Sequence, residues 1–248
     1  MKKILFLLTL LLAVDANAQG DPTQRVHYGE HTADIQPVVV NDHQANLNIK
    51  NPYGSENVTV EFQEIGDDQI KMVARDKNTG KIISSTDGIK DKYVKSSSEI
   101  NGITQDMDLK LSNKDELTGT VGYSNKNTGE SLFANMLGNG AGLLNQTKKG
   151  YKMSLNMRDE DTGTLTYTQA KTKEVICIVD YNKYTSRVYD ANKKLIAEGK
   201  TEDDKPSKVY NKAAWQKCGK VVDIFNEDED DDKEPDIGLS DITSFFGF

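Results

Sequence analysis

Hydrophobic and polar residues alternate with a period of two in several parts of this chain. In residues 107–111 and again in residues 151–155, apolar side chains occupy every second position. This period is typical of β-strands that bury one face and expose the other. Short polar segments rich in Asn, Asp and Gly follow these stretches and suit tight hairpin turns. The pattern therefore predicts a mainly β protein whose neighbouring strands are antiparallel.

A sequence repeat supports this interpretation. Lys114–Glu130 aligns without a gap to Arg158–Glu174, with eight of 17 positions identical. A more diverged copy covers residues 58–80 and has the same order of strand, turn, strand and turn. Roughly ten or more strands follow from such units, and a sheet of that size closes or splits into two packed sheets. We therefore expect antiparallel meander repeats that form a sandwich or barrel-like sheet.

One C-terminal amphipathic helix is expected beside the strands. Trp215, Cys218, Val222 and Phe225 recur at spacings of three, four and three residues. This spacing places all four side chains along one stripe of a helix. We predict a helix over about 207–226 whose apolar stripe packs against the sheet.

The segment Ser131–Gln146 departs from the strand pattern. It brings together five large apolar residues and the glycines Gly138, Gly140 and Gly142. We expect a short helix and a flexible apolar loop here. The segment would either pack over the end of the sheet or form a mobile lip over a ligand or partner surface.

Residues 1–18 have the order of a secretory signal peptide. Lys2 and Lys3 precede the apolar run Ile4–Val14, and small residues surround the expected cleavage site after Ala18. The apolar run has about half of the roughly 20 residues that cross a bilayer as a helix. We expect a periplasmic or secreted protein that does not span the membrane after signal cleavage.

The remaining chain divides by composition into four parts. We expect an N-terminal segment over 19–56 that is partly extended, and a β-repeat domain over 57–226 that includes the helix. An acidic linker over 227–236 and a hydrophobic C-terminal tip over 237–248 follow. A run of like charges such as the linker is usually solvated.

The distribution of charge argues against nucleic-acid binding. The whole chain has a net charge of −8, but residues 227–236 contain eight acidic residues and a single lysine. Residues 19–226 are therefore almost neutral. A neutral body with an acidic tail lacks the basic surface that binds phosphate groups.

Two cysteines remain after the signal peptide, Cys177 and Cys218. An oxidising compartment favours a disulfide between them, which would join the predicted helix to a strand. Two buried free thiols are the alternative, because the geometry of the pair decides whether the bond forms.

The histidines are weak candidates for metal binding. His27, Glu30 and His31 match the H-x-x-E-H pattern, in which two histidines on one helix face bind zinc and the glutamate is a general base. Gly29 interrupts the pattern, and the surrounding residues show no helical period. His43 is the third histidine of the chain. No cofactor is expected.

The C-terminal tip contains Phe245, Phe246 and Phe248, which are costly to leave in water. They either pack onto the sheet of the same chain or anchor the protein to an envelope or extracellular protein. The sequence leaves both possibilities open.

No Ser/His/Asp, Cys/His or nucleotide-binding arrangement occurs in a suitable context, so an enzyme is the less favoured class. The leading hypothesis is an exported non-catalytic β-repeat protein that acts as an envelope or secreted binding or scaffold module. The alternative is a carrier that holds a small apolar ligand in a closed β-barrel. A metal-dependent hydrolase that uses His27, Glu30 and His31 is a third and weaker hypothesis.

Overall fold

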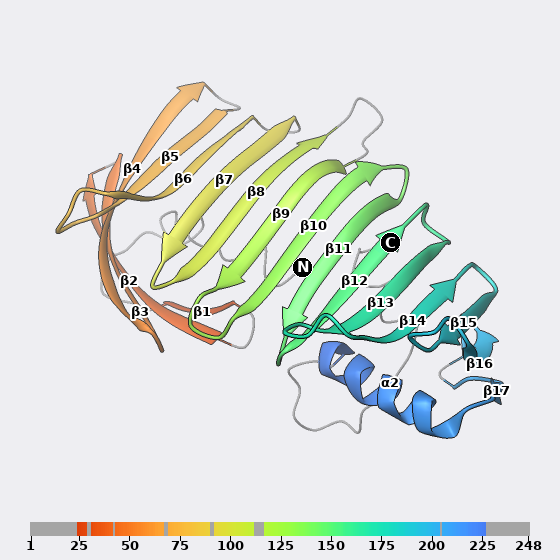
Figure 1. The fold of residues 1–248 in the computed structure, drawn as a ribbon. Coiled ribbons are helices and arrows are strands. Elements are labelled where there is room, and N and C mark those ends of the chain that lie inside the picture. Colours follow the sequence, from red (N-terminus) through yellow and green to blue (C-terminus); the bar gives the residue numbers. More distant parts are fainter. Residues whose placement is uncertain are drawn as a thin grey trace. The chain divides into compact units, whose positions relative to one another are not determined.

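A computed structural model describes residues 24–28, 31–41, 43–66, 69–89, 92–111, 117–203 and 205–226. These residues form a long series of β-strands followed by a single α-helix (Figure 1). The strands form an antiparallel meander that is not closed. The predicted fold class, a mainly β meander with one C-terminal helix, is confirmed. Among the described residues, the sheet does not close into the barrel that the carrier hypothesis requires.

The chain divides into two compact units near residue 115. Unit 1 contains residues up to Asp115 together with Asn125–Asn127, and unit 2 contains the remaining residues. The strands of unit 1 are β1 (Gln24–Tyr28), β2 (His31–Asn41), β3 (Gln44–Asn51), β4 (Gly54–Gly66), β5 (Gln69–Asp76), β6 (Ile82–Ile89), β7 (Tyr93–Ile100) and β8 (Ile103–Leu111).

Strand β3 shows how the alternating pattern produces the two faces of unit 1. Ala45, Leu47 and Ile49 are buried on one face. Asn46 and Asn48 lie on the other face, where each makes a side-chain hydrogen bond of 2.9 Å to the neighbouring strand β4. Burial of the apolar positions stabilises the strand, and the cross-strand amide contacts help to set its register.

A polar network joins residues at three hairpin turns that are assigned to unit 1. The backbone N–H of Asn101, between β7 and β8, donates to Glu56 Oε1 at 2.8 Å. The side-chain amide of Asn101 donates to Asn51 Oδ1 at 3.2 Å. The side chain of Asn127 in turn donates to the backbone carbonyl of Asn101 at 2.9 Å. These bonds hold together turns that do not follow one another directly along the meander.

Unit 2 continues the meander and ends in the helix. Its elements are β9 (Leu117–Asn125, with Asn125 assigned to unit 1), β10 (Glu130–Gly138), β11 (Ala141–Lys148), β12 (Tyr151–Met157), β13 (Gly163–Gln169), β14 (Val175–Tyr181), β15 (Thr185–Tyr189), β16 (Leu195–Lys200), β17 (Lys208–Val209) and α2 (Lys212–Asn226).

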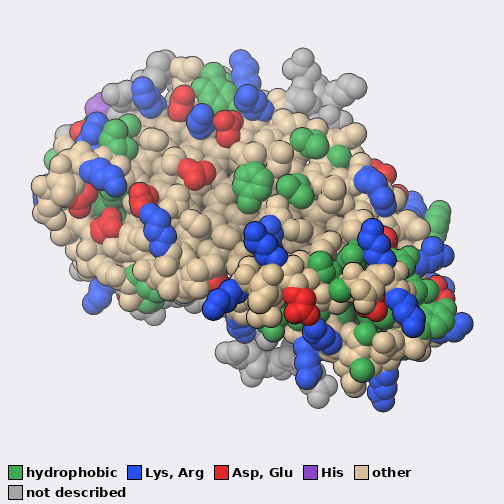
Figure 2. Space-filling model, in the orientation of Figure 1, with side chains coloured by type: hydrophobic (Ala, Val, Ile, Leu, Met, Phe, Trp, Pro, Cys, Tyr) green, Lys and Arg blue, Asp and Glu red, His purple; other side chains and the backbone are tan. Residues whose placement is uncertain are grey.

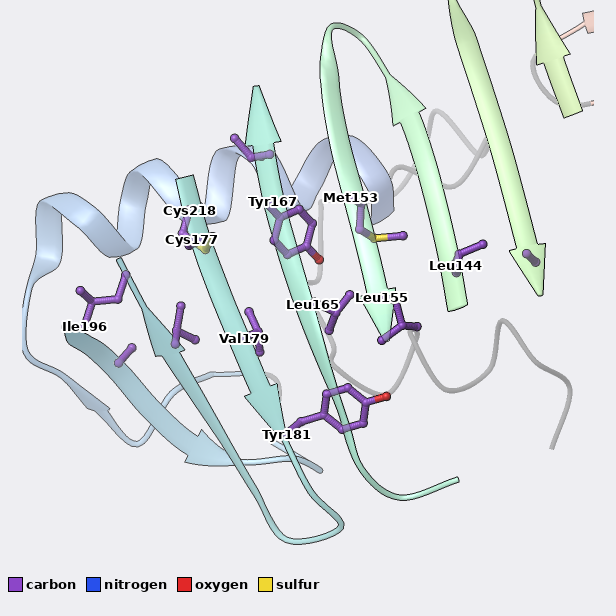
Figure 3. Packing of buried hydrophobic residues seen from close by; sticks show 14 residues of the cluster. Leu144, Met153, Leu155, Leu165, Tyr167, Cys177, Val179, Tyr181, Ile196 and Cys218 are labelled. Carbon is purple, nitrogen blue, oxygen red and sulfur yellow. A yellow bond between two sulfur atoms is a disulfide. The ribbon is translucent and has the colours of Figure 1, made fainter. Parts of the chain in front are cut away.

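The core of unit 2 lies between its strands and α2 (Figure 3). We call the strand face that contributes to this core the inward face, and the opposite face the outward face. Tyr167 is fully buried in the core, and its ring centroid lies 5.8 Å from that of Phe225 in α2. The buried members of the core are Ala134, Leu144, Met153, Leu155, Leu165, Tyr167, Cys177, Val179, Tyr181, Val188, Ile196, Ala197, Cys218 and Val221.

The predicted disulfide is formed. Cys177 in β14 and Cys218 in α2 are joined, with their Cα atoms 5.7 Å apart and both residues fully buried. The bond fixes the helix to the sheet across 41 residues of sequence.

The helix begins later than expected. Residues 208–209 form strand β17, and the first helical residue is Lys212. Asn211 provides the reason, because its side-chain oxygen accepts a hydrogen bond from the backbone N–H of Ala214 at 3.2 Å. Asparagine is a favoured residue at this capping position, where it satisfies a free N–H of the first turn.

The prediction of a helix and loop over Ser131–Gln146 was wrong. The segment forms the hairpin β10–β11, with Leu144 paired opposite Ala134. Asn139 and Gly140 connect the strands with φ angles of 48° and 73°. Positive φ at both central residues is the geometry of a two-residue hairpin turn, for which Asn-Gly is strongly preferred.

Candidate functional site

The outward face of unit 2 is built by the register of its strands. Side chains at paired positions of successive strands form continuous rows across the sheet. One row runs from β10 to β17 and contains Asn135, Leu143, Asn156, Thr164, Asp180, Arg187, Glu198 and Lys208. The next row contains Phe133, Asn145, Ser154, Thr166, Ile178, Tyr189 and Leu195.

Hydrogen bonds between neighbouring strands hold several polar side chains of these rows. Ser154 Oγ donates to Asn145 Oδ1 at 2.5 Å. Thr164 Oγ1 donates to Asp180 Oδ1 at 2.6 Å. Because each pair bridges two strands, these side chains have restricted rotamers before any partner binds. These two pairs fix hydroxyl, amide and carboxylate groups on the outward face.

Exposed apolar side chains form a stripe at the β10–β11 end of the rows. Phe133, Leu137 and Leu143 are 43%, 65% and 36% exposed. Leu143 is paired with Asn135, so Phe133 lies diagonally from it, and Leu137 lies at the register shift between Met136 and Gly138 further along β10. We call these three residues the apolar stripe. Over β9–β11, the visible face in Figure 2 shows a few hydrophobic side chains among neutral ones and few charges.

The shifted pKa values in unit 2 have structural causes. The hydrogen bond from the Thr162 side chain, followed by backbone N–H donors, lowers the pKa of Asp159 in the β12–β13 turn. Burial, and secondarily the negative charge of Asp159, raises the pKa of Tyr181. Burial alone raises the pKa of Tyr167. Asp159 lies in a turn, whereas Tyr167 and Tyr181 belong to the core.

The predicted metal residues do not share a helix. His27 lies in β1 and His31 in β2, two paired antiparallel strands. The H-x-x-E-H pattern of zinc hydrolases needs both histidines on one helix face. His43 is an exposed residue in the turn between β2 and β3. Across the ranges that the structure describes, no three His, Cys, Asp or Glu residues are grouped to hold a metal ion.

The aromatic residues of the C-terminal tip, Phe245, Phe246 and Phe248, lie outside the described residues. So do the signal peptide and the acidic linker. Within the part of the chain that is described, no helix is long and apolar enough to cross a membrane.

Sequence reasoning missed the apolar stripe because its three residues lie in the segment that we expected to be a helix and a loop. Asn139-Gly140 was the signal that could have found it. This dipeptide between two apolar runs marks a hairpin. A hairpin would have placed Phe133 and Leu143 on the same face of two paired strands.

Comparison with known proteins returned no relative. No protein family model, curated protein or solved structure matches this chain. The residues and geometry of the outward face therefore carry the functional argument.

Proposed function

We propose that this protein is an exported, non-catalytic binding module that recognises an envelope or extracellular protein through the outward face of unit 2. The observation that carries the proposal is the apolar stripe Phe133, Leu137 and Leu143, exposed on hydrogen-bonded strands. Contiguous exposed apolar side chains with a polar border are typical of protein-binding surfaces.

The surroundings of the stripe match the anatomy of such an interface. The centre of a protein interface is poor in charge and contains aromatic residues, whereas its rim is polar. In the two rows, the residues next to Phe133 and Leu143 are Asn135, Asn145 and Asn156. Their side chains are neutral and can donate and accept hydrogen bonds. The charged row members Asp180, Arg187 and Glu198 follow only on more distant strands.

Site-specific photo-crosslinking tests the proposal. A photoreactive amino acid at position 135 lies within the stripe, whereas the same group at position 184 replaces Tyr184, which is 73% exposed in the β14–β15 turn. We expect an envelope protein to be crosslinked from position 135 and not from position 184. The double substitution Phe133→Lys with Leu143→Lys should abolish that product, because it places two charges at the centre of the interface.

Circular dichroism and an intact disulfide should show that the double variant folds. The same crosslinked products from positions 135 and 184, or an undiminished product in the double variant, would refute the proposed binding surface.

Export is part of the proposal. The disulfide Cys177–Cys218 is consistent with an oxidising compartment. Mass spectrometry of the protein recovered from the producing cells should find a mature N-terminus at Gln19. Recovery of the uncleaved chain from the cytoplasm would contradict export.

A further inference from the structure

Two hairpin turns of this chain contain the dipeptide Asn-Gly. Asn101-Gly102 connects β7 to β8, and Asn139-Gly140 connects β10 to β11. The φ angles are 51° and 79° in the first turn and 48° and 73° in the second. Because these angles agree closely, a difference in reactivity between the two turns depends mainly on what surrounds each asparagine.

An asparagine that precedes a glycine can convert its own side chain into an acid. The backbone nitrogen of the glycine attacks the side-chain carbon Cγ of the asparagine, a C–N bond forms, and the amide nitrogen leaves as ammonia. Water then opens the cyclic succinimide at one of its two carbonyl groups, and no oxidation or reduction occurs. The products are aspartate, or isoaspartate, in which the main chain runs through the former side-chain carbonyl. Glycine favours the attack because it has no Cβ atom in the way.

The fold requires glycine at position 140. Both central residues of this turn have positive φ, for which Asn-Gly is preferred. Space gives a second reason, because a Cβ atom on Gly140 would lie 2.6 Å from the backbone nitrogen of Glu160 and 3.0 Å from its Cα atom. The hairpin that contains the apolar stripe therefore depends on a dipeptide that is chemically reactive.

Neighbouring residues hold the asparagine of the other turn. The side-chain amide of Asn101 donates to Asn51 Oδ1 at 3.2 Å, and its backbone N–H donates to Glu56 Oε1 at 2.8 Å. Its carbonyl oxygen accepts from Asn127 Nδ2 at 2.9 Å. The side chain of Asn101 must leave Asn51 before its Cγ atom can meet the nitrogen of Gly102. The network therefore protects Asn101 from cyclisation.

Asn139 has no such protection. This residue is exposed, whereas Asn101 is half-buried. Among the residues that the structure describes, none is hydrogen-bonded to the side chain of Asn139. The side chain can therefore turn toward the nitrogen of Gly140 without losing a contact.

We propose that Asn139 is a site of spontaneous modification, at which the chain converts its own amide to aspartate and isoaspartate. The aspartate product adds a negative charge to a turn that packs against Glu160. The isoaspartate product adds one carbon atom to the backbone of a two-residue turn, so Gly138 and Ala141 can no longer keep their pairing. Modification therefore alters the hairpin that contains Leu137 and the rest of the apolar stripe. Its effect on a partner rests on the proposed function, whereas the reaction itself does not.

Peptide mass spectrometry of the folded protein, incubated at mildly alkaline pH, tests the proposal. Trypsin releases Asn101 within residues 96–110 and Asn139 within residues 127–148, and fragmentation locates the modified position. An unincubated sample measures conversion during digestion. We expect conversion at Asn139 to be roughly fivefold faster than at Asn101, the factor that corresponds to breaking one hydrogen bond. Equal rates at the two sites, or an Asn139 that stays unmodified, would overturn the proposal.

Two further measurements separate the effect of the fold from that of the sequence. In urea, where both turns are unfolded, the two asparagines should react at similar rates. A difference that persists in urea would overturn the structural cause. Asn51→Ala removes the acceptor of the Asn101 amide, so it should speed conversion at Asn101 and leave the rate at Asn139 unchanged. No increase at Asn101 in a folded Asn51→Ala variant would contradict protection by the network.

Asn139→Gly is the matched control for the structural consequence, because Gly-Gly also suits this turn and has no side chain to cyclise. After incubation, the backbone amides of β10 and β11 should exchange hydrogen faster in the unsubstituted protein and not in Asn139→Gly. Unchanged exchange in a fully converted sample would overturn the effect on the hairpin.

Crosslinking distinguishes this inference from the proposed function. Incubated protein should give less crosslinked product from position 135 than fresh protein, and incubated Asn139→Gly should give as much as fresh protein. An undiminished product after conversion at Asn139 would overturn the effect on the partner. The absence of any product from fresh protein would refute the proposed binding surface, while conversion at Asn139 would still confirm the modification site.

Discussion

Gly163 occupies a position in β13 where a side chain has no space. A Cβ atom there would lie 2.5 Å from Tyr181 Oη and 2.9 Å from the carbonyl oxygen of Asn156. Both neighbours belong to strands paired with β13. The glycine therefore permits Tyr181 to pack across the strand.

Gly163→Ala should destabilise the protein. The added methyl group must displace a buried tyrosine or separate β12 from β13, and overpacking of this kind costs about 1–3 kcal/mol. Urea denaturation should show a lower midpoint for the variant. Gly219→Ala is the matched control, because nothing lies within 4 Å of a Cβ there and alanine is favoured over glycine inside a helix. An unchanged midpoint for Gly163→Ala would contradict the packing described for β13.

Asp76 shows how a single turn residue responds to pH. The hydrogen bond from Thr79 Oγ1, at 2.6 Å, and the backbone N–H of Thr79 lower the pKa of this carboxyl group. A lowered pKa in the folded state stabilises the turn at pH values above the pKa of the unfolded chain. That contribution is lost as the pH falls through the lowered folded pKa.

Thr79→Val should raise the pKa of Asp76 toward its ordinary value, because the hydroxyl donor is removed. A carboxyl ¹³C NMR titration measures the change. Thr128→Val is the control, since the Thr128 hydroxyl donates to Glu130 in a different turn and makes no bond to Asp76. A pKa of Asp76 that is equally low with and without the Thr79 hydroxyl would refute this cause.

At the scale of elements, the disulfide is the strongest single connection between α2 and the sheet. Replacing both Cys177 and Cys218 with alanine opens a loop of 41 residues. In the chain-entropy model, such a loss costs about 3–4 kcal/mol. Urea denaturation should show this decrease, and reduction of the unsubstituted protein should reproduce it. Equal stability of the oxidised and reduced protein would show that helix packing alone holds α2.

The sequence could predict elements wherever one face alone is apolar. Residues 151–155 alternate cleanly, and they form the strand β12 as expected. In Ser131–Gln146, the outward-facing Phe133 and Leu143 add to the buried Leu144, so apolar residues occur on both faces. The period of two is then hidden, and the run resembles a helix or an apolar loop.

The helix was predictable in type and less so in its start. The apolar helix positions marked the side of the helix that packs on the sheet, and Cys218 is fully buried there. These positions are Trp215, Cys218, Val222 and Phe225. The start depended on Asn211, whose capping bond is a local contact that periodicity does not show.

At the scale of the whole molecule, the negative charge is concentrated in the C-terminal residues. Residues 19–226 contain 28 basic and 29 acidic residues, so most of the negative charge of the chain belongs to residues 227–248. A chain spanning 19–226 should therefore elute from an anion exchanger at pH 7 at much lower salt than a chain spanning 19–248. Equal elution would mean that the body already neutralises the tail.

The candidate site could not be predicted at this scale. Phe133 and Asn145 are brought together by the pairing of β10 with β11, and Asn145 and Ser154 by the pairing of β11 with β12. Each pairing depends on a turn, and a shift of one residue would move every side chain to the other face. The composition of the rows was visible in the sequence, but their assembly into one surface was not.

The position of the disulfide also constrains the order in which the protein matures. Cys177 precedes Cys218 by 41 residues of sequence, so a growing chain contains Cys177 before its partner has been made. Until then Cys177 is an unpaired thiol on a strand whose covering helix has not arrived. Protein production would therefore depend on how well the producing cell protects that thiol from mispairing.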